Sequence, residues 1–409
     1  MKLLLSLAVL CLVLASADGA RGEGFAVYEW SARGLALGGA AMARAPDPSA
    51  IASNPAALVY VPGTQLQAGA SLIMPVGRIE FDDFGRERVA DEYWVIPHGY
   101  FSHQVTENFS LGIGEYTRFA LGLDYPKNWP GRYNIHNVEV QSVSVTPVAA
   151  LKLTDKLSVG LGLEVMYLDA IIKKAESTKT KDHPAGYGDA WVNLNGDSFG
   201  FGGNFSLHYK LDEEWSFGAI YRSAVQHKVE GDSKVEMPAA LGGGTQKQDL
   251  HANFTMPESV SAAVAWSPTP DLSFELMATW TRWSRFRYLN LHFEDGSTAY
   301  MTEHWKDAWR FGLGVEYSAA DWLDLRAGYV WDQCPVTERY ENYMIPTANR
   351  QIVSIGTGLK WDDWTLDLAY AFLWAHARSY DDRPQDGVFS SKTYDTRSHI
   401  VSMTLGYKF

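Results

Sequence analysis

The side chains that could carry out chemistry in this 409-residue chain do not form a catalytic or metal-binding pattern. Ser206 and His208 would share one face of a strand, yet such a pair is common by chance, and a triad is recognised by a geometry that spacing alone cannot supply. No nucleophile elbow on a strand-to-helix turn and no phosphate-binding P-loop is expected. Eleven histidines are present, but His98 and His103 are five residues apart and His304 stands alone, unlike paired metal ligands. We therefore expect no enzyme activity, no metal and no cofactor.

Composition and charge exclude further classes of protein. The formal net charge of −13 disfavours nucleic acid and acidic substrates as partners. No stretch of about 18 apolar residues follows residue 17, so a membrane helix is not expected. The 15 Trp, 21 Tyr and 18 Phe are nevertheless a heavy aromatic load. Aromatic residues at both membrane interfaces are typical of transmembrane β-barrels.

The first 17 residues are predicted to be a secretory signal peptide. One lysine, Lys2, precedes a short apolar run that ends in the small residues 15–17. Cys11 lies inside that run, which leaves Cys334 as the one thiol of the exported part. An exported chain with a single cysteine has no internal disulfide framework.

Alternation of apolar with small or polar residues recurs from about residue 64 to the end of the chain. Clear examples are residues 157–167, 309–317 and 364–374. Successive side chains of a strand point to opposite faces, so each run has one apolar face. In a soluble sandwich that face would be the core. Here many apolar stripes begin or end in Trp or Tyr, as a lipid-facing band with aromatic girdles does.

Short and long connections alternate between these runs, as in an up-and-down barrel with periplasmic turns and extracellular loops. The short connections are residues 154–156, 212–214, 268–271, 319–321 and 362–363. The long polar ones are residues 173–195, 227–253, 293–303, 334–349 and 378–396. The runs number about 12 to 15, each about 9–11 residues long.

The stretch before residue 63 is rich in small residues and does not alternate. It contains Asn54-Pro55-Ala56 and resembles the FadL/TodX family of outer-membrane channels for hydrophobic compounds. That resemblance implies an all-β fold: a transmembrane antiparallel β-barrel of about fourteen strands, with an N-terminal hatch of short helices plugging the lumen. The expected division is residues 1–17 signal peptide, 18–62 hatch and 63–409 barrel. A surface loop with an Asn-Pro turn is the alternative for the motif.

The resemblance also implies roles for three further groups of residues. Gly24 and Phe25 match the family segment that reaches the ligand pocket, although Phe25 could simply pin the hatch to the wall. Gly112, Gly114 and Glu115 fall in the third strand, where the family has a kink that opens the barrel wall; a plain lumen-facing glycine pair is the alternative. An extracellular capture loop, or a loop merely anchored by its aromatic rings, would contain Trp129, Gly131, Arg132 and Tyr133.

The function expected from the resemblance is passive uptake of fatty acids or aromatic hydrocarbons, with lateral release through the wall. The protein is expected in the bacterial outer membrane, as a monomer in contact with lipopolysaccharide and other membrane lipid. A general porin or a surface adhesin is the alternative. A porin would line its lumen with charge and lack a hatch, and an adhesin would need longer loops than these.

Overall fold

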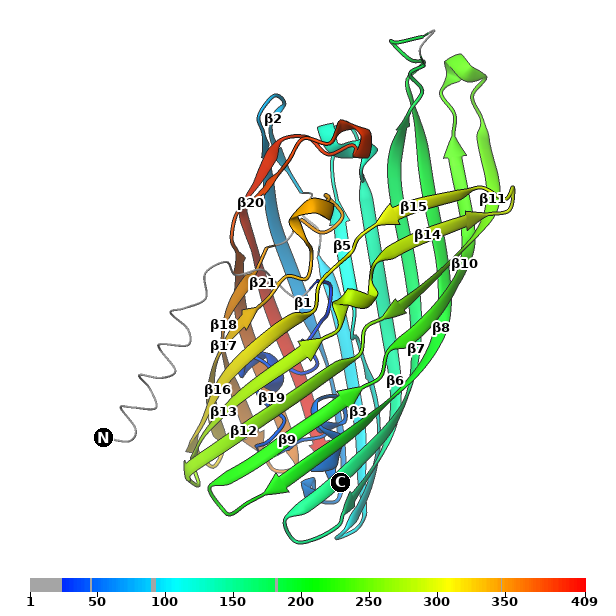
Figure 1. The fold of residues 1–409 in the computed structure, drawn as a ribbon. Helices are drawn as coiled ribbons and strands as arrows, with labels where there is room; N and C mark the ends of the chain where they lie inside the picture. Colours follow the sequence, from blue (N-terminus) through cyan, green and yellow to red (C-terminus); the bar gives the residue numbers. More distant parts are fainter. Residues whose placement is uncertain (1–23, 45, 90–92, 181–182, 347) are drawn as a thin grey trace.

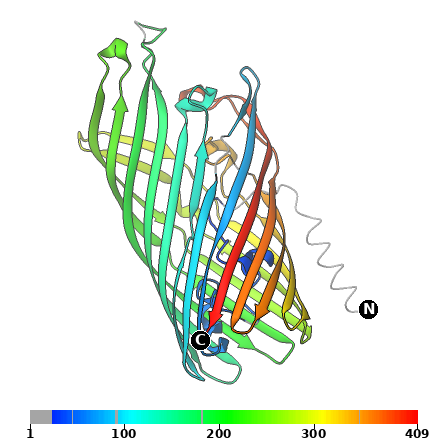
Figure 2. The ribbon, with the colours of Figure 1, turned by 180° about the vertical axis from the view of Figure 1, so that it is seen from behind.

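The computed structural model describes residues 24–44, 46–89, 93–180, 183–346 and 348–409. The predicted signal peptide, residues 1–17, lies outside the described residues. Strands make up most of the described chain and form one closed antiparallel barrel (Figures 1 and 2). No helix among the described residues is both long and apolar enough to cross a membrane.

The described residues form strands β1 (Thr64–Phe81), β2 (Gly85–Arg88), β3 (Trp94–Thr106), β4 (Phe109–Tyr116), β5 (Ala120–Asp124), β6 (Asn137–Lys152), β7 (Leu157–Ser177), β8 (Asp189–Lys210), β9 (Trp215–Arg222), β10 (Val225–Glu236), β11 (Thr245–Met256), β12 (Ser259–Thr269), β13 (Leu272–Thr281), β14 (Tyr288–Phe293), β15 (Thr298–Thr302), β16 (Ala308–Ala320), β17 (Leu323–Asp332), β18 (Arg350–Trp361), β19 (Trp364–Ala375), β20 (Arg378–Tyr380) and β21 (Ser391–Lys408). Five barrel strands are interrupted: β4 with β5, β9 with β10, β11 with β12, β13 with β14, and β15 with β16. With these joined and the short β2 and β20 set aside, the described chain has fourteen spanning strands, which confirms the predicted fold class.

Pairing of the last strand with the first closes the barrel. β21 runs antiparallel to β1 from Gln65↔Lys408 to Phe81↔Ser391, with one irregularity between Val76 and Arg78. The alternation seen in the sequence sorts side chains between the lumen and the outside. Leu163 of β7 and Phe201 of β8, 72% and 73% exposed, belong to an outer apolar surface too large for a protein in water.

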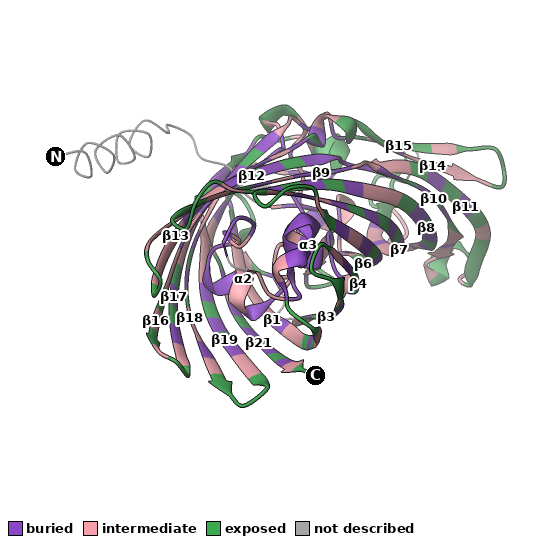
Figure 3. Ribbon diagram, turned by 90° about the horizontal axis from the view of Figure 1, so that it is seen from below, coloured by how far each residue is buried: buried purple, intermediate pink, exposed green. Residues whose placement is uncertain are grey.

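The described part of the N-terminal segment, residues 24–62, is not a strand of the barrel. It contains two short helices, α2 (Ala32–Ala36) and α3 (Ala50–Ser53), and the 3₁₀ helix η1 (Pro55–Tyr60). The view from the short-turn end shows α2 and α3 inside the ring of strands (Figure 3). Ser31 caps α2 by accepting a hydrogen bond from Gly34 N, and Pro55 begins η1, where its missing N–H is not needed.

Further 3₁₀ turns lie in the connections and at one strand interruption: η2 (Pro130–Tyr133), η3 (Ala239–Leu241), η4 (Trp283–Arg285), η5 (Glu338–Tyr340) and η6 (Pro384–Asp386). The loop that carries η2 packs against the connection that carries η5, residues 333–349. Both lie at the end of the barrel that has the longer connections. This is the extracellular end, since the short turns and the C-terminus share the opposite end.

Candidate ligand cavities and lateral opening

Asn54 ties the N-terminal segment to itself and to the wall. Its side-chain amide Nδ2 donates to the Met42 carbonyl (2.8 Å) and to the Leu207 carbonyl of β8 (3.1 Å), and the residue is fully buried. Ala56 follows at once: its N–H donates to Ser206 Oγ (2.9 Å), and its carbonyl accepts from Ser158 Oγ (2.7 Å). The Asn-Pro-Ala turn is therefore held by both β7 and β8 through directional bonds.

A buried carboxylate on β13 holds the next stretch of the segment. The oxygens of Glu275 accept from the backbone N–H groups of Met42 (2.7 Å), Ala43 (3.2 Å) and Arg44 (2.9 Å). The Arg44 guanidinium completes the site at 3.3 Å from Glu275 Oε2. Three backbone donors and one cation satisfy an anion that would otherwise be very costly to bury.

A second charged network fastens α2. Arg33 donates to Glu316 of β16 at 2.9 and 2.7 Å, and Glu316 also accepts from Arg326 of β17 at 2.6 Å. Arg326 in turn pairs with Asp324 and Asp367, so opposite charges alternate across three strands. The network links the segment to the barrel at a second, separate place.

Two serine–histidine pairs among the described residues involve strand β8. Ser206 and His208 face the lumen, where His208 Nε2 lies 3.0 Å from the Ala43 carbonyl and Ser206 holds Ala56. Residues 196–200 do have the Gly-x-Ser-x-Gly spacing, and Ser198 Oγ lies 2.9 Å from His227 Nδ1. Ser198 is nevertheless in the middle of β8, whereas a nucleophile elbow is a strand-to-helix turn.

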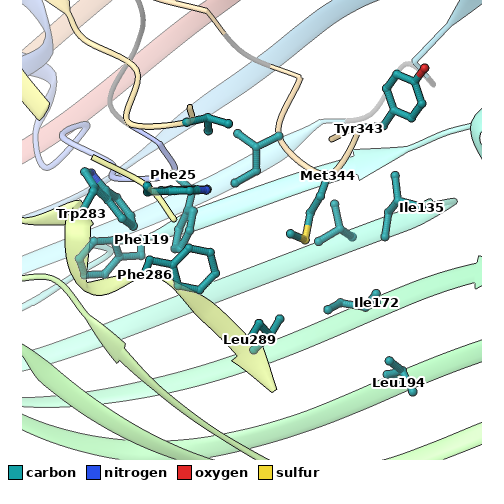
Figure 4. Close-up of a cluster of buried hydrophobic side chains, with 14 of the residues drawn as sticks. Phe25, Phe119, Ile135, Ile172, Leu194, Trp283, Phe286, Leu289, Tyr343 and Met344 are labelled. Carbon is teal, nitrogen blue, oxygen red and sulfur yellow. The ribbon is translucent and has the colours of Figure 1, made fainter. Parts of the chain in front are cut away.

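Above the short helices the lumen is apolar. Phe25 packs against four rings: Phe119, Trp283, Phe286 and Trp305 at centroid distances of 6.0, 4.8, 6.2 and 5.8 Å. The close-up shows Phe25, Phe119, Trp283 and Phe286 gathered together, with Ile172 of β7, Leu194 of β8 and Leu289 of β14 to one side of them (Figure 4). Gly24 has φ +57°, and a Cβ there would lie 2.9 Å from Trp305, so a glycine is required for the approach.

Two cavities adjoin this cluster. The larger, of about 400 Å³, runs from Phe25 toward β1, β3 and β5. The smaller, of about 80 Å³, lies toward β7, β8, β10, β11 and β14 and is lined by apolar side chains with Asn195 and Gly196. Phe25, Leu121 and Ile345 line both cavities and stand between them. The smaller cavity has the usual form of a site for a hydrophobic ligand, whereas the larger is lined by charged side chains, four of them arginines, as well as by apolar ones.

The barrel wall is interrupted beside the larger cavity. β3 pairs with β4 only as far as Gly99↔Glu115, and β5 pairs with β6 but not with β3. Residues 94–98 pair with β1, and residues 120–124 pair with β6. The two segments face each other, but no backbone pairing joins one to the other among the described residues. Both of these segments line the cavity, and Val95 in the first of them is 65% exposed on the outer side of the barrel. The cavity therefore reaches an opening in the wall.

The N-terminal segment satisfies the backbone where the strand breaks at residues 117–119. Val27 N donates to the Arg118 carbonyl (2.8 Å), Ala120 N donates to the Phe25 carbonyl (3.0 Å), and Trp30 Nε1 donates to the Thr117 carbonyl (2.7 Å). On the other side, Ser142 Oγ of β6 accepts from Phe119 N at 3.0 Å. Irregular backbone is stable at membrane depth when it is buried in protein in this way.

The residues predicted to form the kink lie just before the break. Gly112 and Gly114 are in β4, paired on both sides, with a negative φ. They face the lumen, where a Cβ would come within 2.7 Å of Ile51 of α3. The glycines thus give room to the N-terminal segment, and the interruption itself begins at Thr117. Glu115 alternates with them and faces outward beside the opening, next to Val145.

The predicted capture loop is folded in on itself. Trp129 is fully buried, stacks on Tyr125 at 3.9 Å and donates from Nε1 to the Ile135 carbonyl (2.9 Å). A Cβ on Gly131 would lie 2.4 Å from the Trp129 ring. The Trp129 ring is thus an anchor of the loop, as in the alternative of a loop held by its aromatic rings.

Arg132 and Tyr133 bind the carboxylate of Asp189, at the extracellular start of β8. Arg132 Nε lies 2.8 Å from Asp189 Oδ2, and the Tyr133 hydroxyl donates to Oδ1 at 2.7 Å. Partial burial alone would raise the pKa of Asp189, but these hydrogen bonds and the Arg132 charge outweigh it and hold the pKa below its ordinary value. The bonds of Arg132 and Tyr133 to Asp189 hold this loop against the extracellular end of β8.

Sequence reasoning missed the inward-facing charges and most of the cavity wall. Glu275, Glu316 and Arg326 all interrupt the small-residue face of an alternating run, and that signal could have identified them. Leu121 and Ile345 carried no such signal, because only the fold brings them to Phe25. Among the described residues, no three potential ligands gather in a way that could hold a metal ion.

Comparison with known proteins gives consistent results. The family model of the outer membrane protein transport protein family (OMPP1/FadL/TodX) matches residues 13–409. The chain is 25% identical to the long-chain fatty acid transport protein of Salmonella typhi, over 88% of this chain and 89% of that protein. The fold is similar to the crystal structure of a Pseudomonas aeruginosa FadL homologue (TM-score 0.83, 18% identity, 94% of this chain and 100% of that one). It also resembles the Pseudomonas putida toluene transporter TodX (TM-score 0.76, 17% identity, 93% and 99% coverage).

Proposed function

Because the chain belongs to the FadL/TodX family of outer-membrane transport proteins, we propose that it takes up hydrophobic molecules of the fatty-acid or aromatic-hydrocarbon class by passive transfer. The observation that supports this most strongly is the pair of cavities inside the lumen that meet at Phe25: the smaller is lined almost wholly by apolar side chains, and the larger combines apolar side chains with four arginines and Glu29. Burial of each CH₂ group there contributes about 0.8 kcal/mol, so an apolar ligand enters without an energy source.

We further propose that the N-terminal segment acts as the hatch and that the ligand leaves sideways. The segment fills the lumen near the short turns and supplies Phe25 to the partition between the cavities. An apolar molecule gains little by entering the aqueous periplasm but keeps its transfer free energy in hydrocarbon. The gap between β3 and β5 offers that route, and Phe25 is bonded through its carbonyl to Ala120, the first residue of β5.

Uptake by the full-length protein in vesicles tests the proposal. Protein-containing vesicles should accumulate radiolabelled oleate or toluene faster than protein-free vesicles, while sucrose entry stays at background. Equal acceleration of sucrose and of the hydrophobic probes would instead identify a general porin. No acceleration of either hydrophobic probe would reject hydrophobe transport.

A further inference from the structure

The Trp94 side chain reaches across the unpaired part of the wall. Trp94 is the first residue of β3 and pairs with Ile73 of β1. In the alternation of β3, it falls on the lumen-facing side, as Ile96 and His98 do. Gly122 lies across the opening in β5, opposite Glu139 of β6. The indole rests directly on Gly122: a Cβ there would be 1.9 Å from Trp94 Cζ2 and 2.1 Å from Cε2.

The contact joins two strands that share no backbone pairing at this height. β3 is bonded to β1 at Trp94, and β5 is bonded to β6 at Gly122. Only a glycine lets a flat ring approach the backbone this closely. Trp94 and Gly122 both line the 400 Å³ cavity, as does the outward-facing Val95. The ring therefore stands between the cavity and the membrane.

The ring is held by packing as far as the described residues go. Trp94 Nε1 is buried and has no hydrogen-bond partner among the described residues. A buried indole N–H is normally bonded, as Trp30 Nε1 is to the Thr117 carbonyl at 2.7 Å and Trp129 Nε1 is to the Ile135 carbonyl at 2.9 Å. A ring without that bond can rotate away from Gly122 without breaking a hydrogen bond.

We propose that Trp94 determines the width of the molecules that leave by the lateral opening. The inference rests on the proposed function, because it assigns the selecting residue to the lateral route. Narrow, flexible hydrocarbons pass beside the ring, whereas wide, rigid ones require it to swing off Gly122.

The test compares two uncharged probes, octane and pyrene, in vesicles that contain the full-length protein. Trp94→Ala should raise pyrene entry by about tenfold and change octane entry much less, since a pocket discriminates by size on that scale. Trp309→Ala is the matched control: Trp309 is 44% exposed on the outer face of β16 and lines neither cavity. The control should leave the pyrene-to-octane ratio unchanged.

Trp94→Cys provides a reversible version of this test, in which one folded sample is measured with and without a bulky group at position 94. Cys334 is buried, so a thiol reagent should react at the introduced site. Benzyl methanethiosulfonate should restore a bulky group and lower pyrene entry, and a reductant should raise it again.

An unchanged pyrene-to-octane ratio in both folded Trp94 variants, with octane still entering, would overturn the role of Trp94 alone. Failure of the unmodified protein to admit either probe would overturn the proposed function as well.

Discussion

The two halves of the lumen use opposite chemistry. Near the short turns, charges and amides hold the N-terminal segment, through Glu275, Arg33 and Asn54. Toward the extracellular end, rings and aliphatic side chains around Phe25 meet across two cavities. Directional bonds fix one arrangement of a segment, because each buried donor must meet its acceptor. Apolar contact has no such requirement, so it suits a site that ligands of varied shape must enter and leave.

The largest effect is expected where the polar half depends on a single carboxylate. Glu275→Ala leaves Arg44 Nε and three backbone N–H groups without this acceptor, which should weaken docking of residues 42–44 by about 3–5 kcal/mol. Single-channel conductance should rise, and amide exchange at residues 42–44 should accelerate. Glu80→Ala removes an exposed ion pair with Arg86 and serves as the control. Unchanged conductance and exchange for Glu275→Ala would show that the polar half does not depend on this anchor.

Substitutions of Asn54 separate a turn residue from an anchor. Asn and Asp serve similarly in turns, but an aspartate at this position would present an oxygen to the two carbonyls that Asn54 Nδ2 now binds. Asn54→Asp should therefore destabilise the segment at least as much as Asn54→Ala, by about 1–3 kcal/mol. Both variants should lower hydrophobe uptake. If Asn54→Asp kept both hydrophobe uptake and slow amide exchange in the segment, the motif would be only a turn and not an anchor.

Phe25→Ala probes the apolar half. It removes the ring shared by the two cavities and with it part of the roughly 1.5–3 kcal/mol that burying a phenylalanine contributes. We expect oleate affinity to fall by about tenfold, a change of about 1.4 kcal/mol, while ion conductance stays low. Equilibrium binding and conductance on one preparation measure both. A rise in conductance without loss of affinity would mean that Phe25 only pins the segment.

The smallest effect is expected at the loop closed by Asp189. Its folded-state pKa is depressed, so the stabilisation is present above the unfolded pKa of about 4 and is lost as pH falls through the lower folded value. Between pH 5 and 8 the loop should not change. Asp189→Asn should raise amide exchange at residues 129–133 at neutral pH by an amount corresponding to less than about 1 kcal/mol, because solvent screens the pair. A pH-dependent loosening between pH 5 and 8 would contradict this assignment.

The contrast between the halves was only partly visible in the sequence. Alternation predicted the barrel because each strand records its own two faces, and the resemblance placed Asn54 and Phe25 in a segment apart from the strands. Gly112 and Gly114 were predicted to mark a kink, but they lie in paired strand, and the interruption follows at Thr117. Where a strand breaks depends on what replaces its lost hydrogen bonds, and here the replacement comes from Phe25, Val27 and Trp30.

Sequence by itself therefore determined the fold class, the separate N-terminal segment and the family, since local alternation and motif spacing are written along the chain. Only the tertiary structure decided which residues meet. Trp94 and Gly122 touch because two strands diverge at one height, and Glu275 binds Arg44 across 231 positions of sequence. For Trp129 the sequence left a capture role and an anchoring role open, and only the fold shows that the ring packs against Tyr125 and Tyr343. Such contacts depend on strand register and on the path of loops, and these are settled by closing the whole barrel.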